Sequence, residues 1–179
     1  MRVLLLGVGA ILVFFSSVGL FLYFKPGGST PAEREPPIFV AGPIDGFEPG
    51  SVSYFKLDHV YIVRMQDDAF LALYDLGPNI QAMLKAGDEA ALECRVEFIE
   101  DENGLARLGD PPPGFEDRIF IESCQGNAWD AMGRHLTGPG EADLDRFPLG
   151  VVDGVVRVDV TNRRCMNPVS ESAPCIETQ

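Results

Sequence analysis

The sequence predicts an all-β domain, a sandwich or a stack of small antiparallel sheets, and three observations lead to this class. Short segments rich in β-branched and aromatic residues recur between residues 52 and 160. Asp153-Gly154 stands between two valine pairs, which is a strong hairpin signal. Only the segment from Asn79 to Ala91 carries apolar residues at helical spacing. A chain of many short strands and one short helix fits packed antiparallel sheets.

The expected strands follow one another with short polar turns between them. Residues 93–98 alternate between polar and apolar, which is typical of a strand with one buried face. In the helical segment, Ile80, Met83 and Leu84 are expected to share one face. The other expected strands are Val52–Leu57, His59–Arg64, Ala69–Tyr74, Arg118–Glu122 and the two arms of the hairpin at 151–156.

The chain of 179 residues is acidic, with 27 Asp and Glu against 14 Lys and Arg and a formal net charge of −13. All of the acidic excess lies beyond Pro36, since residues 1–36 carry three basic and two acidic residues. Such a surface repels phosphate backbones, so nucleic acid is not an expected partner, whereas a basic protein partner is favoured. One carboxylate-rich stretch predicts a solvated face, with a calcium site as the alternative: Asp88, Glu89, Glu93, Glu97, Glu100, Asp101 and Glu102.

Residues 1–25 are expected to form a membrane anchor. The run from Val3 to Phe24 carries no charge and has the length of about 20 residues that a helix needs to cross the hydrocarbon core. A cleaved signal peptide is the alternative, but its apolar region is shorter and ends at a small-residue cleavage site. A linker rich in proline and glycine is expected over residues 26–46, the folded domain over 47–160 and a C-terminal tail over 161–179.

Four cysteines lie beyond the linker, at positions 94, 124, 165 and 175, and none belongs to a C-x-x-C pair that would indicate zinc. An even number of cysteines in an anchored domain predicts two disulfide bonds in an oxidising compartment. Free buried thiols in a cytosolic domain are the alternative. We therefore expect the domain on the extracytoplasmic side of the membrane, periplasmic or outer.

One stretch has a more specific pattern. The segment 122–130, ESCQGNAWD, precedes Gly138-Pro-Gly140, then Phe147-Pro-Leu149 and the Asp153-Gly hairpin. This succession resembles the second half of a Rieske iron–sulfur domain, where C-x-C-H-G-S-x-[FY]-D, a Gly-Pro loop, L-x-x-[YF]-P-V and D-G-x-V-x-V follow in this order. The resemblance covers roughly residues 47–160. With the N-terminal anchor and linker, the chain is similar to the Rieske subunits of cytochrome bc-type complexes.

The resemblance implies a site that has lost its metal ligands. Two cysteines and two histidines hold a Rieske [2Fe–2S] cluster. The matching positions here are Gly77 and Asn79 in the first motif and Glu122 and Gln125 in the second. The only two histidines, at positions 59 and 135, lie outside both motifs and are expected at the surface. The resemblance thus implies that the chain holds no cluster, and we expect no other cofactor and no metal.

Disulfide-bearing Rieske proteins carry a further cysteine in each motif, and these two form a bridge beneath the cluster. Cys94 and Cys124 match those positions, so the resemblance implies a Cys94–Cys124 disulfide. Cys165 and Cys175 remain as the candidate second pair.

About a dozen residues separate the first motif from Cys94, and we expect them to form a short helix in the space that a cluster would fill. An alternative register, counted back from Cys94, places Glu89 and Ala91 at the first-motif ligand positions. Trp129, at the aromatic position of the second motif, is expected to pack into the core.

Two functional hypotheses follow from the resemblance. The first is a cluster-less Rieske-fold subunit with a structural or interaction role in a membrane electron-transfer complex, bound to integral-membrane or cytochrome-like subunits. The alternative is a Rieske-type electron carrier from quinol to cytochrome with atypical cluster ligation, for which carboxylates and amides are poor ligands. An enzyme with its own catalytic site is not indicated, since the sequence has no G-x-S-x-G, H-E-x-x-H or phosphate-binding loop.

Overall fold

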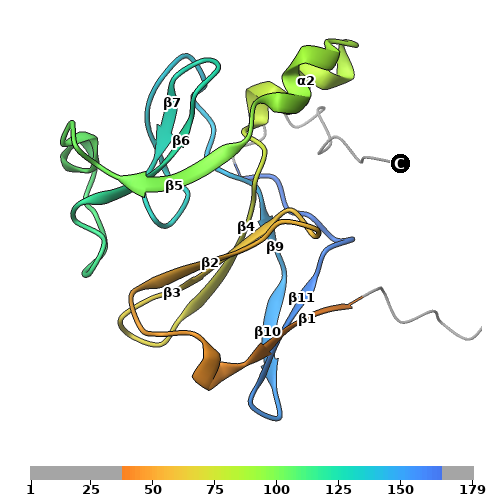
Figure 1. Cartoon of the computed structure of the whole chain (residues 1–179), viewed down its shortest axis with the longest axis vertical. Helices are drawn as coiled ribbons and strands as arrows, with labels where there is room; N and C mark the ends of the chain where they lie inside the picture. The colour runs from red at the N-terminus through yellow and green to blue at the C-terminus, as the bar shows by residue number, and fades with distance from the viewer. Residues whose placement is uncertain (1–37, 167–179) are drawn as a thin grey trace, which may run out of the picture. The chain divides into compact units, whose positions relative to one another are not determined.

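The computed structural model describes residues 38–166, which belong to one compact unit of the chain. These residues form three small antiparallel sheets and one short α-helix, so the predicted all-β class is confirmed (Figure 1). Within this range, no helix has the length and apolar character that spanning a membrane requires. The predicted anchor, residues 26–37 of the predicted linker, and Cys175 lie outside the described residues.

The sheets are formed by strands that are mostly close in sequence. In the first sheet, β11 (Val155–Asp159) lies between β1 (Ile38–Pro43) and β10 (Leu149–Val152). The second sheet has the order β2 (Ser51–Phe55), β3 (Val60–Arg64), β4 (Phe70–Tyr74) and β9 (Arg146–Phe147). The third sheet consists of β5 (Val96–Glu100), β6 (Arg118–Glu122), β7 (Asn127–Trp129) and β8 (His135–Thr137). The helical elements are α2 (Pro78–Lys85) and three 3₁₀ turns, η1 (Ile44–Gly46), η2 (Glu89–Glu93) and η3 (Leu105–Leu108).

The second sheet is the middle layer, because its strand β3 is buried along both faces. Successive side chains of a strand point to opposite faces. Val60 and Ile62 pack in a core shared with β11 of the first sheet. Tyr61 and Val63 pack in a second core shared with the third sheet, where Trp129 is the largest fully buried side chain. The expected position of the tryptophan in the core is therefore confirmed.

One excursion of the chain, residues 75–145, builds α2 and the third sheet. The chain leaves the second sheet after β4 and returns at β9, which pairs with β4. The two ends of the excursion are neighbours, since the Tyr74 N–H donates to the Asp145 carbonyl oxygen at 2.9 Å. Figure 1 shows α2 and the strands β5–β7 in its upper half, and the β10–β11 hairpin with β1 in its lower half. We term the two crossing points, Asp75 and Asp145 with the side chains that bind them, the neck.

The expected helix over 79–91 is wrong in its length. The helix α2 ends at Lys85, and η2 follows as a separate turn. Gly87 lies between them with φ +89°, a left-handed conformation that ends a helix and that glycine adopts at little cost. Because η2 extends to Glu93, β5 begins at Val96 and not at Glu93 as expected.

The folded domain also extends beyond its expected boundaries of 47 and 160. The strand β1 lies within the range 26–46 assigned to the linker, and it pairs with β11 along its length. The ring of Phe39 packs edge-on against Phe55 at a centroid distance of 4.9 Å, which explains why β1 belongs to the domain. At the other end, the backbone of Arg164, in the expected tail, pairs with that of Arg146 of β9 in an isolated antiparallel β-bridge.

Candidate functional site

Three loops of the excursion meet, and the four positions matched to cluster ligands lie in these loops or at the ends of α2 and β6 beside them. The first loop follows β4 and leads into α2, the second is the turn between β6 and β7, and the third follows β8. We term this region the loop site and define it by five residues: Gly77, Asn79, Glu122, Gln125 and Gly140.

The carboxylate of Glu122 closes the turn between β6 and β7. Its side chain is fully buried. It accepts hydrogen bonds from the backbone N–H groups of Cys124 and Gln125, the latter at 3.1 Å, and from Asn127 Nδ2 at 3.3 Å. These donors all belong to the same turn, and they satisfy the carboxylate locally. Among residues 38–166, no ion pair involves Glu122.

Asn79 and Gln125 contact each other across two loops. The Asn79 Nδ2 group donates to Gln125 Oε1 at 3.2 Å, although the residues are 46 positions apart in sequence. The Gln125 Nε2 group lies 2.9 Å from the sulfur of Met83, which joins the turn to α2. These two amides occupy the positions that the resemblance matches to the histidine ligands.

The third loop closes over this amide pair. The Gly140 N–H donates to Asn127 Oδ1 at 2.8 Å, so Asn127 connects this loop to the turn that holds Glu122. A Cβ atom at Gly140 would lie 2.7 Å from Asn79 Nδ2, so a larger residue here would force the Asn79 side chain to move. The Gly-Pro-Gly sequence therefore permits a close approach between loops that are distant in the chain.

Gly77 packs against Trp129 and makes no polar contact with the other loop-site residues. It precedes Pro78 at the start of α2, and a Cβ atom here would lie 3.0 Å from Trp129 Cη2. The indole N–H of Trp129 donates to the carbonyl oxygen of Ala142 at 2.9 Å. Because Gly77 has no side chain, the ring of Trp129 has room to pack against it.

The residues of the alternative register lie elsewhere. Glu89 is exposed on η2, and Ala91 is buried beside Cys94 in the first core. Among the side-chain hydrogen bonds of the described residues, Gln125 is joined to Asn79 and not to Glu89. The contact across the loops favours the register that contains Asn79.

A disulfide bond joins Cys94 to Cys124, as the resemblance implies, with a Cα–Cα distance of 5.6 Å. Cys94 is buried where η2 ends, and Cys124 is exposed in the turn after β6. The bond closes a loop of 30 residues, which stabilises the fold by roughly 3–4 kcal/mol in the chain-entropy model. The expected pairing of Cys165 with Cys175 stays a prediction.

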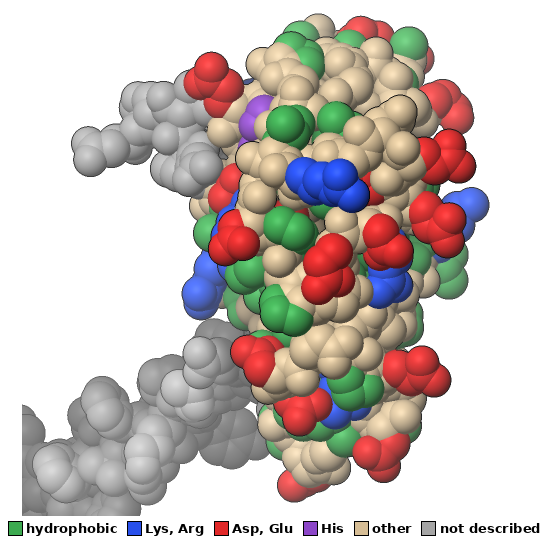
Figure 2. Space-filling view, turned by 90° about the vertical axis from the view of Figure 1, so that its left-hand side faces the viewer, with side chains coloured by type: hydrophobic (Ala, Val, Ile, Leu, Met, Phe, Trp, Pro, Cys, Tyr) green, Lys and Arg blue, Asp and Glu red, His purple; other side chains and the backbone are tan. Residues whose placement is uncertain are grey.

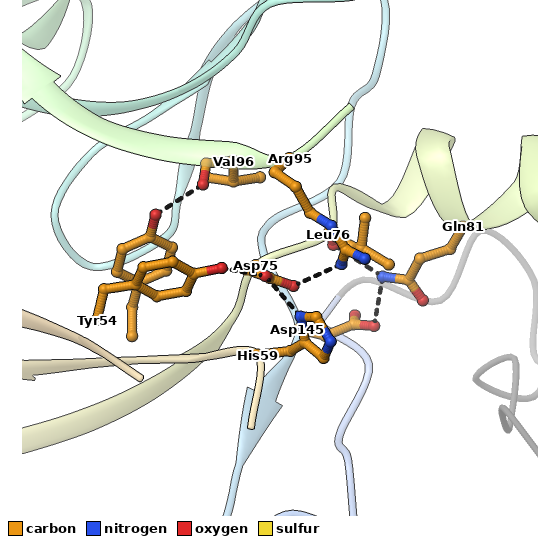
Figure 3. Close-up of polar contacts among 9 residues, drawn as sticks. Tyr54, His59, Asp75, Leu76, Gln81, Arg95, Val96 and Asp145 are labelled. Carbon is orange, nitrogen blue, oxygen red and sulfur yellow. Dashed lines mark hydrogen bonds and ion pairs between the residues drawn. The ribbon is translucent and has the colours of Figure 1, made fainter. Parts of the chain in front are cut away.

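The neck is a second polar centre, and sequence reasoning did not find it. The Asp75 carboxylate is fully buried and binds three side chains: the Tyr54 hydroxyl donates to it at 2.6 Å, His59 Nδ1 lies at 2.9 Å and Arg95 at 3.0 Å (Figure 3). Burial and the hydrogen bond to Asp75 raise the pKa of Tyr54 above its ordinary value. His59 was expected as a surface histidine, and its side chain is partly exposed, but one ring nitrogen binds this carboxylate.

The returning end of the excursion is bound in a similar way. Gln81 Nε2 on α2 donates to Asp145 Oδ2 and to the Leu76 carbonyl oxygen, both at 3.0 Å (Figure 3). Arg163 lies 3.4 Å from the same carboxylate oxygen of Asp145. Burial raises the pKa of the Asp145 carboxyl group above its usual range.

Next to the neck, Tyr61 joins the second sheet to the third. Its hydroxyl donates to the Val96 carbonyl oxygen at 2.8 Å, and burial raises the pKa of this group to about 12. The sequence contains the polar residues of the neck, but their partners are 16 to 64 positions apart and follow no local motif. Only the pairing of the strands brings them together.

The carboxylate-rich stretch after α2 does not gather into a calcium site. Asp88 accepts a hydrogen bond from the Ala90 N–H, and the carboxylate of Asp101 accepts one from the Ala106 N–H at the start of η3. In the part of the chain that the structure describes, a single group of His, Cys, Asp and Glu side chains lies close enough together to hold an ion: Cys94, Glu122 and Cys124.

No model of a known protein family matches this chain, and no curated protein matches it either.

Proposed function

We propose that this chain is a Rieske-fold protein without an iron–sulfur cluster that acts as a structural or interaction subunit of a membrane electron-transfer complex. The observation that carries the proposal is the contact between Asn79 and Gln125 under the Gly140 loop. The sequence resemblance matches these two residues to the cluster's histidine ligands, and such ligands must converge from two loops. The convergence of the two matched positions supports the resemblance independently of the sequence pattern.

The residues of the loop site do not fit a [2Fe–2S] cluster. Such a cluster needs thiolate or imidazole ligands, whereas Asn79 and Gln125 offer amides and Gly77 offers no side chain. The Glu122 carboxylate binds the N–H groups of its own turn, and oxygen ligands suit hard cations. The two nearby cysteines are joined in a disulfide. This donor set gives no support to the alternative of an electron carrier with atypical ligation.

Contacts within the protein connect the loops where a cluster would connect them in the family. The Met83 side chain on α2 contacts Gln125, and Ile80 on the same helix is completely buried in the first core. We infer that α2, the amide pair and the Cys94–Cys124 bond together replace the cluster as the connection between the loops. In this proposal, the protein keeps the fold without the cofactor, and its role is to bind partner subunits and not to transfer electrons.

The surface charge favours a basic partner. Figure 2 shows more Asp and Glu side chains than Lys and Arg side chains on the face that it draws. Several arginines are engaged within the domain, as Arg95 binds Asp75 and Arg134 binds Asp130 at 2.6 Å. The exposed surface therefore has fewer free cations than the composition indicates, and it would attract a basic cytochrome-like subunit. In this proposal, Val3–Phe24 anchors the domain on the extracytoplasmic side of the membrane.

The absence of a cluster is tested by measuring iron and acid-labile sulfide in the purified full-length chain, with an EPR spectrum of its reduced form. We expect a colourless protein without stoichiometric iron and without the low-g signal of a histidine-ligated cluster. Two iron and two sulfide per chain would overturn the proposal.

The role in a complex is tested separately, by purifying the tagged chain from its native membranes in mild detergent. We expect it to copurify with haem-containing subunits in a fixed ratio, and to lose them in high salt if the acidic surface provides the contact. A chain that elutes alone at low salt would contradict the proposed role in a complex.

A further inference from the structure

The Cys94–Cys124 bond lies beside a buried carboxylate that pairs with no cation among residues 38–166. One sulfur from each cysteine and one carboxylate oxygen of Glu122 lie within 4.8 Å of one another. Cys94 and Glu122 are buried, and Cys124 is exposed. Two sulfurs and an anionic oxygen at this spacing are three donors of a metal site, with both sulfurs now occupied by their bond to each other.

We propose that reduction of the Cys94–Cys124 disulfide creates a zinc-binding site whose protein ligands are the two cysteine sulfurs and the Glu122 carboxylate. The disulfide is the metal-free state of this site, and the site becomes available only under reducing conditions. Nothing in this inference depends on the proposed role in a complex.

The reducing step needs two electrons, which a dithiol supplies. A phosphine supplies them equally well, because it is oxidised to its oxide while water provides the oxygen and the two thiol protons. A thiolate of the dithiol attacks the exposed Cys124 sulfur, the protein S–S bond breaks, and the Cys94 thiolate leaves and takes up a proton. The second thiolate of the dithiol attacks the mixed disulfide, which releases Cys124 and forms the disulfide of the oxidised reductant. When Zn²⁺ binds, each cysteine thiol loses its proton to solvent.

Zn²⁺ is the cation that fits these donors. Thiolates select borderline and soft metals, and zinc accepts two thiolates together with a carboxylate oxygen. In a tetrahedral zinc site two sulfurs lie about 3.8 Å apart, which the sulfurs reach only after their bond is broken. Because Cys124 is exposed, water has access to the fourth position.

The charge balance also favours a divalent cation. Two thiolates would add negative charge next to a buried carboxylate whose present partners are all uncharged N–H groups. Bringing like charges together in a buried site is unfavourable unless a cation neutralises them. Zn²⁺ supplies this charge at the point where the three donors converge.

The experiment uses the full-length C165S/C175S chain, in which Cys94 and Cys124 are the only thiols. The chain is reduced with a phosphine, which offers zinc no thiol of its own, and Zn²⁺ is titrated against a chromophoric chelator. We expect one Zn²⁺ per reduced chain and none per oxidised chain. With Co²⁺ in place of zinc, thiolate charge-transfer absorption and the visible bands of tetrahedral Co²⁺ should appear only after reduction.

Variants in the same background separate a built site from two free thiols. C94S should abolish binding, and Glu122→Gln should weaken it at least about tenfold. Glu93→Gln is the matched control, because Glu93 is next to Cys94 in sequence but is exposed and lies outside the group. It should leave the affinity unchanged.

Two results would overturn the proposal. One is a reduced chain that takes up no Zn²⁺. The other is a reduced chain whose zinc affinity is the same with Glu122→Gln as with Glu93→Gln, since unfolded thiols would also bind without the carboxylate. Trp129 emission, recorded in every titration, reports whether the reduced chain stays folded.

Discussion

The neck and the loop site each contain a buried carboxylate, and they satisfy it in opposite ways. At the neck, Asp75 binds the Arg95 guanidinium together with Tyr54 and His59, which come from other parts of the fold. At the loop site, Glu122 binds only uncharged N–H groups of its own turn. A carboxylate with distant partners holds elements together, whereas one with local partners fixes only its own loop.

This difference indicates where the stability of the domain resides. The neck has charge pairs and hydrogen bonds that cross from the second sheet to the excursion. The loops of the loop site are joined by the amide contact between Asn79 and Gln125, by the hydrogen bond from Gly140 to Asn127 and by one disulfide. We therefore expect changes at the neck to affect the whole fold, and changes at the loop site to act mainly through the Cys94–Cys124 bond.

Asp75→Asn should have the largest effect. The substitution keeps the shape of the side chain but removes the charge that Arg95 pairs with, and it disturbs the contacts of Tyr54 and His59. Removing one partner of a buried ion pair costs about 3–5 kcal/mol, and the disturbed contacts of Tyr54 and His59 add to this cost. Urea unfolding monitored by the emission of the single tryptophan measures the loss. Asp110→Asn is the control, since Asp110 is exposed, and its stability should equal that of the wild type.

Reduction of the disulfide should have the second largest effect. Opening the Cys94–Cys124 loop is expected to lower the free energy of unfolding by roughly 3–4 kcal/mol and to expose Trp129 earlier during heating. The C165S/C175S chain, melted with and without a phosphine reductant, measures this effect for the one bond. EDTA added to the oxidised chain should leave the midpoint unchanged. A shift with EDTA but none with reductant would reveal a metal site that the disulfide-bonded fold retains.

Tyr61→Phe should cost less, about 1 kcal/mol at neutral pH, because it removes one hydrogen bond to the Val96 carbonyl group. The hydroxyl has a second effect at high pH. Its pKa is raised to about 12 in the folded chain, whereas an unfolded tyrosine ionises near pH 10. Its contribution is thus complete below about pH 10 and is lost as pH rises toward about 12.

Stability measured from pH 8 to 12 checks the sign of this effect. The wild-type chain should lose stability more steeply than Tyr61→Phe above pH 10, since the substitution removes one group that takes part in the loss. Parallel curves for the two chains would show that Tyr61 ionises as easily in the fold as in the unfolded chain.

The comparison also explains what the sequence predicts well and what it does not. The strands β2, β3, β4 and β6 and the hairpin were expected close to their observed positions, because β-branched and aromatic runs between clear turns are local signals. The strands β7, β8 and β9 have only two or three residues each, and they form through pairing: β7 with the longer strand β6, β9 with the longer strand β4, and β8 with β7. No local pattern announces such strands.

The two polar centres, the loop site and the neck, also differ in whether the sequence predicts them. The loop-site residues were found through a resemblance that spans many motifs, and the disulfide followed from it. The neck was not found, because Asp75 reads as an ordinary turn residue until the register of β3 and β4 brings His59 beside it. Buried polar networks between sheets depend on pairing that local sequence patterns do not encode.

The smallest expected effect tests the register of the loop site. Asn79→Ala and Gln125→Ala should each cost about 0.5–1.5 kcal/mol, and the double variant should cost less than their sum, since both remove the same contact. Glu89→Ala is the control, because Glu89 stands in the alternative register and is exposed. Its combination with Gln125→Ala should be additive. Unfolding free energies from urea titrations of the five variants provide both cycles. If Gln125 coupled with Glu89 and not with Asn79, the alternative register would be the correct one. The positions matched to the ligands would then no longer converge as the proposed fold requires.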